Sequence, residues 1–460
     1  MRTQQLLFFF LTLTIFSCST KSQKTETAAP PVTEQPKVTQ ELKAGEITPT
    51  VFCDNDASQS YSLYLPKNYT DALKFPVIIF FDPHGSGSYP VGLFRSLADQ
   101  FGYILMGSYN AKNGLQFDQT NIIVNSLIAE AGTKYSSDKK RISLAGFSGG
   151  SKVALVGASN HPELLSVIYC GAAIPFDNIH QLPPALGFAG VRDMNFTEVM
   201  ASGPVLEAKK INHALIEWKG KHEWPDSLSF EDAFYWCDFN AMRNKLLATD
   251  NNLVKNYLQK KNKLIAASKN SLTQYDQFNQ LIAFLQGVVD VSSYRQKLTS
   301  LMNGDSYKKE LQKQQGNFQM ESNLKQNYME CFQSKDLNWW RDEISRMRNL
   351  KAGEQEMMYQ RLLGYLSLAS YSYSNNAIRQ NNFSAAQQFL AIYKLADPEN
   401  SEQPFLTACM YARQGDQGKA IAALKEAVQL GLKDKGKVES EESFNSLRGN
   451  TEFNKLLSGL

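Results

Sequence analysis

Residues 146–150 read Gly146-Phe147-Ser148-Gly149-Gly150, a Gly-x-Ser-x-Gly stretch. A short apolar run (141–145) precedes it, and a run of small residues with helical character (152–158) follows it. This pattern predicts a strand, a sharp turn and a helix. In such a turn the serine takes a strained backbone conformation, and side chains in place of the glycines would collide with the strand and helix. The alternative is an ordinary glycine-rich turn, and the rest of the chain has to discriminate between them.

Length and composition indicate a folded protein with more than one domain. The chain has 460 residues, 43% of them hydrophobic and 20% charged, with a formal net charge of +3. A chain of this length is expected to form roughly two to three domains. The nearly balanced charge shows no bias toward polyanions, so we expect no nucleic-acid partner.

The first residues have the layout of a secretory signal. Arg2 is followed by the apolar run 6–16 and then by small residues before Cys18, and this run is too short to span a bilayer permanently. Residues 15–18 resemble a bacterial lipobox, which implies that Cys18 becomes the lipidated first residue of an exported protein held at the periplasmic side of a membrane, such as the outer membrane. Cleavage and release into the periplasm is the alternative. Residues 19–45, rich in Thr, Lys, Gln, Glu and Pro, predict a disordered tether.

The other cysteines do not suggest a metal site. Five remain after Cys18, scattered along the chain without metal-type spacing: Cys53, Cys170, Cys237, Cys331 and Cys409. We interpret them as mostly buried small hydrophobic residues, with at most one or two disulfides. No metal and no cofactor is expected.

Strand and helix patterns alternate between residues 46 and 245. The run 75–81 is apolar on both faces, as a central strand of a parallel sheet requires. Further strands are predicted at 46–53, 60–65, 104–108, 141–145, 165–172, 184–190 and 213–218, the first two of them as an antiparallel pair, with helices at 91–100, 118–134 and 152–158. This alternation predicts an α/β fold, a mostly parallel sheet with helices on both faces, whose reactive groups lie at the carboxyl ends of the strands.

Three residues with complementary chemistry each follow a predicted strand, in the order Ser148, Asp193, His222. A serine hydroxyl is a poor nucleophile at neutral pH, so a histidine must accept its proton. A buried carboxylate then fixes the tautomer of the ring and stabilises the imidazolium. The oxyanion that forms needs two N–H donors, which we assign to the backbones of Gly149 and of Gly85 or Ser86, in the loop after strand 75–81.

Residues of about 50 to 240 resemble the α/β-hydrolase superfamily, in its esterase and polyhydroxybutyrate-depolymerase-like branch. The resemblance rests on His84-Gly85, on the elbow at 146–150, on Gly190-Val191-Arg192-Asp193, and on Gly220-Lys221-His222-Glu223-Trp224-Pro225. It implies a nucleophile at Ser148, an acid at Asp193 and a base at His222. Only 45 positions separate Ser148 from Asp193, which leaves no room for a large lid and favours a small acyl group or a polymer end.

Other residues compete for these roles. His213 is the rival base, and Asp177 and Asp226 are rival acids. His161 and His180 are expected to be structural.

The second half is expected to be helical. Residues 226–397 contain no proline and few glycines, and 230–247 predict the last helix of the hydrolase-like domain. After a helical region at 246–355, residues 356–460 show a period of 34 that pairs Tyr371 with Phe405 and Ala386 with Ala420. This spacing resembles tetratricopeptide repeats, which implies a protein or peptide partner. Any antiparallel array of helical hairpins is the alternative.

The sequence therefore predicts an exported serine esterase that acts on a small-molecule or polymer ester through an acyl-enzyme, with a helical interaction domain. Two other functions stay open. A serine peptidase can share the fold, and a surface protein without catalytic activity could use the helices for binding.

Overall fold

The computed structural model describes residues 42–177, 179–350 and 353–460. The predicted signal segment 1–18, with Cys18, lies outside the described residues, and so does the predicted tether 19–45 except for its last four residues. In the part of the chain that is described, no helix combines the length and the apolar character needed to cross a bilayer.

An eight-stranded sheet forms the N-terminal part of the described chain. Its strands are β1 (Ile47–Phe52), β2 (Ser60–Tyr64), β3 (Phe75–Phe81), β4 (Ile104–Ser108), β5 (Ser137–Phe147), β6 (Ser166–Cys170), β7 (Ala185–Gly190) and β8 (His213–Trp218). They lie in the order β1-β2-β4-β3-β5-β6-β7-β8, with β2 antiparallel to both neighbours and every other pair parallel. This topology confirms the predicted α/β-hydrolase sheet.

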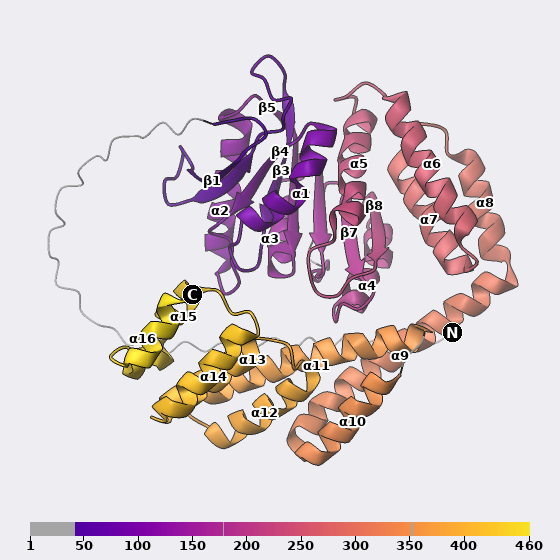
Figure 1. Ribbon diagram of the computed structural model, residues 1–460. Coiled ribbons are helices and arrows are strands. Elements are labelled where there is room, and N and C mark those ends of the chain that lie inside the picture. Colours follow the sequence, from indigo (N-terminus) through magenta and orange to yellow (C-terminus); the bar gives the residue numbers. More distant parts are fainter. Residues whose placement is uncertain (1–41, 178, 351–352) are drawn as a thin grey trace. The chain divides into compact units, whose positions relative to one another are not determined.

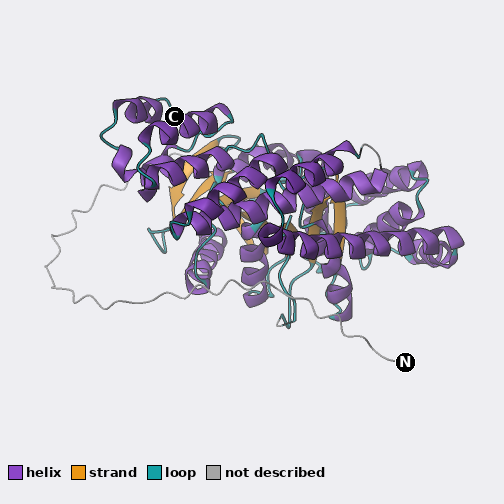
Figure 2. Ribbon diagram, turned by 90° about the horizontal axis from the view of Figure 1, so that it is seen from below, coloured by secondary structure: helices purple, strands orange, loops and turns teal. Residues whose placement is uncertain are grey.

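Helices cover both faces of the sheet (Figures 1 and 2). They are α1 (Ser88–Phe101), α2 (Phe117–Thr133), α3 (Gly149–Asn160), α4 (Phe196–Ala208) and α5 (Ser227–Arg243). Helices α1 and α5 pack against each other, and so do α2 and α3. Neighbouring residues of β5 show that these pairs lie on opposite faces: Ala145 belongs to the core cluster that contains α5, whereas Leu144 approaches Gly157 of α3.

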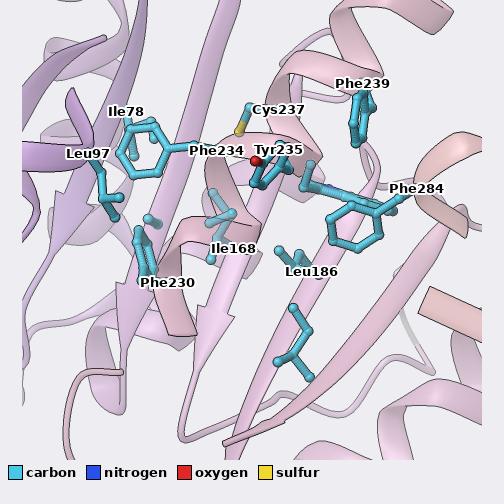
Figure 3. Packing of buried hydrophobic residues seen from close by; sticks show 14 of the residues in the cluster. Ile78, Leu97, Ile168, Leu186, Phe230, Phe234, Tyr235, Cys237, Phe239 and Phe284 are labelled. Atoms are coloured by element: carbon cyan, nitrogen blue, oxygen red, sulfur yellow. The ribbon is translucent and has the colours of Figure 1, made fainter. Parts of the chain in front are cut away.

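One hydrophobic core joins the sheet to the first helices beyond it. Phe230 and Phe234 of α5 pack with Ile78 and Ile168 of the strands (Figure 3). The same cluster continues into α6 (Asn251–Ala267) and α7 (Ser271–Leu285), where Phe284 stacks on the ring of Tyr257 at a centroid distance of 4.9 Å. The core therefore extends past residue 245, and the domain boundaries stay a prediction.

The rest of the described chain is helical, as predicted. The remaining helices are α8 (Ser292–Asn303), α9 (Asp305–Ser334), α10 (Leu337–Asn349), α11 (Gly353–Arg379), α12 (Phe383–Ala396), α13 (Glu402–Arg413), α14 (Gln417–Gln429), α15 (Lys435–Ser440), a 3₁₀ turn (Glu442–Leu447) and α16 (Thr451–Ser458). Side chains cap several of their N-termini: Asp250, Asn270 and Asp336 each accept a backbone N–H of the first turn of α6, α7 or α10.

The segments with the 34-residue spacing form two pairs of helices, α11 with α12 and α13 with α14. Ala386 and Ala420 are fully buried, which allows the helix backbones to approach closely. Their assignment to the tetratricopeptide class stays a prediction. The five cysteines of the described residues are all buried, as predicted, and none of them forms a disulfide.

Candidate active site

Ser148 lies at the sharp turn between β5 and α3. Its φ of 53° and ψ of −119° place it in a strained backbone region, and its N–H donates to the carbonyl of Cys170 at 2.9 Å. A Cβ at Gly146 would overlap the carbonyl oxygen of Gly150, and a Cβ at Gly150 would overlap that of Phe81. The turn therefore requires both glycines, and the Ser148 side chain stands at the carboxyl end of β5.

The structure brings Ser148, His222 and Asp193 into one hydrogen-bonded chain. His222 Nε2 lies 2.9 Å from Ser148 Oγ, and His222 Nδ1 lies 2.9 and 3.0 Å from the two carboxylate oxygens of Asp193. Because an ionised carboxylate only accepts hydrogen bonds, Nδ1 carries the proton and Nε2 is free to accept from the serine hydroxyl. This is the protonation state that a general base needs.

Burial differs along this chain of side chains. The Asp193 side chain is 1% exposed, whereas that of His222 is 25% exposed. The carboxylate also accepts the backbone N–H of Asn195 at 2.8 Å, and the Asn195 side chain donates to the carbonyl of Gly171 at 2.8 Å. A Cβ at Gly171 would come within 2.9 Å of Asp193 Oδ2, so a glycine is needed beside the carboxylate. Asp193 is held from several sides, while His222 is reachable from solvent.

The loop after β3 is tied to the histidine turn through Asp82. Its two carboxylate oxygens accept the backbone N–H of His84 and the indole N–H of Trp224, both at 2.9 Å. Phe147 places its ring 4.8 Å from the imidazole of His222, measured between centroids. These contacts fix the two loops that flank Ser148 relative to each other.

Two backbone N–H groups are available as oxyanion donors. Gly149 is the first residue of α3, so its N–H has no partner within the helix. Of the two residues predicted for the second donor, Gly85 has a φ of 68° and donates its N–H to the carbonyl of Asp82 at 3.1 Å. Ser86 makes no backbone N–H hydrogen bond within the described residues, which leaves it the better placed of the two.

The rival residues lie in other settings. His213 begins β8, at the end of the strand remote from its carboxyl edge, and its Nδ1 lies 2.9 Å from the carbonyl of Ile211. Asp226 caps α5 by accepting the N–H of Ser229 at 2.7 Å. Asp177 and His180 are exposed in the connection after β6, and the ring of His161 lies near Glu163 and Asn125.

Sequence reasoning missed Asn113. Its side-chain oxygen occupies the space that a Cβ of Gly149 would need, so its amide lies directly beside the residue that follows Ser148. The Asn113 backbone N–H donates to the carbonyl of Pro83 at 2.9 Å, which joins its loop to the segment after β3. No motif marks an asparagine in a polar loop, so the sequence held no signal for it.

Comparison with solved structures finds similar folds at low identity. An esterase from Pyrobaculum calidifontis is 12% identical, with a TM-score of 0.36, and the match covers 44% of this chain and 85% of that one. An S-formylglutathione hydrolase from Staphylococcus aureus is 11% identical, with a TM-score of 0.33, and the match covers 39% of this chain and 90% of that one. An esterase from Thermogutta terrifontis is 14% identical, with a TM-score of 0.34, and the match covers 42% of this chain and 90% of that one.

No family model matches the sequence, and no curated protein is significantly similar to it. At this level of similarity, function has to be inferred from the residues of the chain itself.

Proposed function

We propose that this protein is a serine hydrolase that cleaves carboxylic esters through an acyl-enzyme. The observation that carries the proposal is the chain of hydrogen bonds from Ser148 through His222 to the buried Asp193, with 2.9 Å on either side of the imidazole. Serine, imidazole and carboxylate in this order are the set that activates a hydroxyl for attack on a carbonyl.

In the proposed reaction, the Ser148 hydroxyl attacks the ester carbonyl as its proton passes to His222 Nε2. The N–H groups of Gly149 and Ser86 stabilise the oxyanion, and Asp193 stabilises the imidazolium. His222 then donates the proton to the departing alcohol. Water, activated by the same imidazole, hydrolyses the acyl-enzyme and restores the Ser148 hydroxyl.

We further propose that the substrate has a small acyl group or is the end of a polymer. Between β6 and β7 the chain has only the connection 171–184 in which a lid could be built. A site without a large lid offers little apolar cover for a long acyl chain.

The proposed enzyme is exported and lipidated at Cys18, an inference from the sequence pattern alone. Metabolic labelling with an alkyne fatty acid tests it: the wild-type chain should carry the label, and Cys18→Ser should not. Labelling that persists in Cys18→Ser would contradict lipidation at this residue.

The helical region is proposed to bind a protein or peptide partner. Helices α12, α13 and α14 line a hollow of about 200 Å³ with both apolar and charged side chains, among them Leu390, Tyr411, Lys394 and Glu426. Isothermal titration calorimetry with peptides recovered by a screen of random peptides against the wild-type chain tests this proposal. Binding that Tyr411→Ala removes supports it, and binding that is unaffected places the partner elsewhere.

The test of the enzyme activity uses the Ser148→Ala variant of the full chain. It should lose hydrolysis of p-nitrophenyl acetate and labelling by a fluorophosphonate probe, with an unchanged circular dichroism spectrum. Ser159→Ala, which removes a half-buried hydroxyl at the far end of the same helix α3, is the matched control and should keep both. A wild-type protein that neither labels nor hydrolyses would favour a binding protein instead. Cleavage of amides without cleavage of esters would favour a peptidase.

A further inference from the structure

Two cations from the helical region contact the turn that carries Asp193. The turn joins β7 to α4, and two of its backbone carbonyls flank the acid residue. Val191 O accepts a hydrogen bond from Arg361 Nη1 at 2.8 Å, and Met194 O accepts one from Lys325 Nζ at 2.9 Å. Arg361 lies on α11 and Lys325 on α9, 170 and 131 positions away from their partners in the sequence. Helices α9 and α11 pack against each other (Figure 1).

Both cations are held by one buried carboxylate, that of Glu321 on α9. Arg361 donates to Glu321 Oε2 from Nε at 2.9 Å and from Nη2 at 2.7 Å, and Lys325 Nζ lies 2.9 Å from Oε1. The Glu321 side chain is fully buried, and those of Arg361 and Lys325 are 6% and 17% exposed. The carboxylate therefore orients both donors toward the turn.

The first residue of α4 completes this arrangement. The guanidinium of Arg361 lies over the ring of Phe196, 4.8 Å from its centroid, and Phe318 of α9 packs edge-on to the same ring at 5.9 Å. The backbone N–H of Phe196 in turn donates to the carbonyl of Asp193 at 2.9 Å. Thus Arg361 contacts the acid turn both before Asp193, at Val191, and after it, at Phe196.

Stability alone is a poor reason for a buried charge cluster at this place. Replacing a buried ion pair by apolar side chains of similar volume is often neutral or stabilising, because removing the charges from water costs as much as their attraction returns. Apolar side chains would hold α9 and α11 against α4, but they could not donate to the carbonyls of Val191 and Met194. The directed hydrogen bonds are what the charged residues add.

We propose that Arg361 and Lys325 are positioning residues that orient Asp193 toward His222, so that catalysis depends on helices α9 and α11. This inference rests on the proposed function of the Ser148, His222 and Asp193 set. A misplacement of about 1 Å at a catalytic group costs up to roughly 100-fold in rate. Loss of either cation should therefore lower kcat through the acid, without removing any group that contacts the substrate.

The test compares Arg361→Met and Lys325→Met in the full chain. With p-nitrophenyl acetate, we expect kcat to fall roughly 10- to 100-fold while KM changes less than about twofold. The acid limb of the pH–rate profile should move to lower pH, because a displaced carboxylate stabilises the imidazolium less. A simple loss of folded protein would scale the whole profile without moving it.

A conservative variant and a control variant separate an effect on the position of Asp193 from a general loss of stability. Lys325→Arg, which can still donate to Met194 O, should restore most of kcat. Arg346→Met is the matched control: this arginine of α10 also forms a two-bond pair with a glutamate, Glu343, and lies over an aromatic ring, Tyr359, at 5.0 Å. It makes no contact with the acid turn among the described residues, so kcat and the pH–rate profile should be those of the wild type.

A spectroscopic measurement keeps this inference apart from the proposed function. The proton that His222 donates from Nδ1 to Asp193 should give a downfield ¹H NMR resonance, assigned by its loss in His222→Gln. We expect it to weaken or shift in Arg361→Met and Lys325→Met but not in Arg346→Met, whether or not the wild type hydrolyses esters. If Arg361→Met does not fold, Lys325→Met decides alone. An unchanged resonance in the folded variants, together with unchanged kcat where activity exists, would overturn the inference.

Discussion

Trp224, two residues after His222, donates its indole N–H to Asp82 Oδ2 at 2.9 Å, at the carboxyl end of β3. Both side chains are buried, and the other oxygen of Asp82 accepts the N–H of His84. Edge-on packing of the indole against Phe80 and Phe94 fixes its orientation. A single carboxylate thereby links the histidine turn to the loop that supplies the proposed second oxyanion donor.

Trp224→Phe should therefore impair both catalysis and stability. The variant keeps most of the aromatic packing but leaves one oxygen of a buried carboxylate without its donor, which costs about 1–3 kcal/mol. We expect a roughly tenfold or larger fall in kcat/KM, because both loops lose a shared anchor. Urea denaturation and steady-state kinetics measure the two effects.

The control for this substitution is Trp236→Phe. Trp236 is fully buried on α5, and among the described residues its indole N–H makes only a long contact of 3.5 Å with the carbonyl of Pro184. It should lose stability without a change in kcat/KM. Equal kinetic effects of the two substitutions would show that Asp82 does not couple the loops.

The glycines of the elbow should respond differently to alanine. A Cβ at Gly146 or Gly150 would overlap backbone carbonyl oxygens, which cannot move without displacing β3 or α3. A Cβ at Gly149 would instead meet the side-chain end of Asn113, an exposed residue that can rotate away. We expect Gly146→Ala and Gly150→Ala to lose several kcal/mol of stability and Gly149→Ala to fold with a melting temperature near that of the wild type.

Thermal unfolding followed by circular dichroism tests this ranking. The double variant Gly149→Ala with Asn113→Ala serves as the control, since it removes the colliding side chain. If Gly149→Ala alone is as unstable as Gly146→Ala, and the double variant is not improved, the elbow is constrained in a way that these contacts do not explain.

Much of the sheet could be predicted because its signals are local. The apolar run 75–81 is β3 as predicted, and the strand at 104–108 has the predicted bounds. Strand β5 begins at Ser137 rather than at 141, because Ser137 pairs with Phe75 although residues 138–140 are polar. A strand that extends through a polar stretch shows no hydrophobic pattern there, so the start of β5 was not predicted.

Residues 246–355 were predicted only as one helical region, although capping residues marked its divisions. Asp250, Asn270 and Asp336 precede α6, α7 and α10 and accept N–H groups of the first turn. Such residues ahead of an amphipathic stretch are known helix-start signals. Attention to them would have separated these helices.

The proposed triad residues each follow a predicted strand, so they were expected together at the carboxyl edge of the sheet. The groups that hold them could not be predicted. Arg361 donates to Val191 across 170 positions, and a single arginine on a helix with many polar residues looks like any surface residue. The contacts of Asn113 and Asp82 also form between loops that are far apart in the sequence, so they could not be predicted either. Contacts of this kind depend on tertiary packing and leave no spacing rule in the sequence.

Asp238 makes the folded state sensitive to pH. Tyr103 donates its hydroxyl to Asp238 Oδ1 at 2.6 Å, and both residues are buried between α5 and the sheet. Burial raises the pKa of Asp238 from 3.8 to about 6, against the hydrogen bond from Tyr103 and the charge of Arg141, which lower it. Because the pKa is higher in the folded state, the stability that this group contributes is present below about pH 4 and is lost as the pH rises through 6.

Asp238→Asn should remove this dependence, since a neutral amide keeps an acceptor for Tyr103 and carries no charge. A shift of about two pKa units corresponds to roughly 3 kcal/mol. The free energy of unfolding of the variant, measured in urea, should therefore gain about 2–3 kcal/mol relative to the wild type between pH 4 and 7. Asp99→Asn should show the opposite slope, but below about pH 4: burial raises the pKa of Asp99, but hydrogen bonds from the Lys67 N–H and the Tyr64 hydroxyl outweigh it and lower the pKa. A constant difference between wild type and Asp238→Asn from about pH 4 to 7 would mean that Asp238 titrates alike in the folded and unfolded chain.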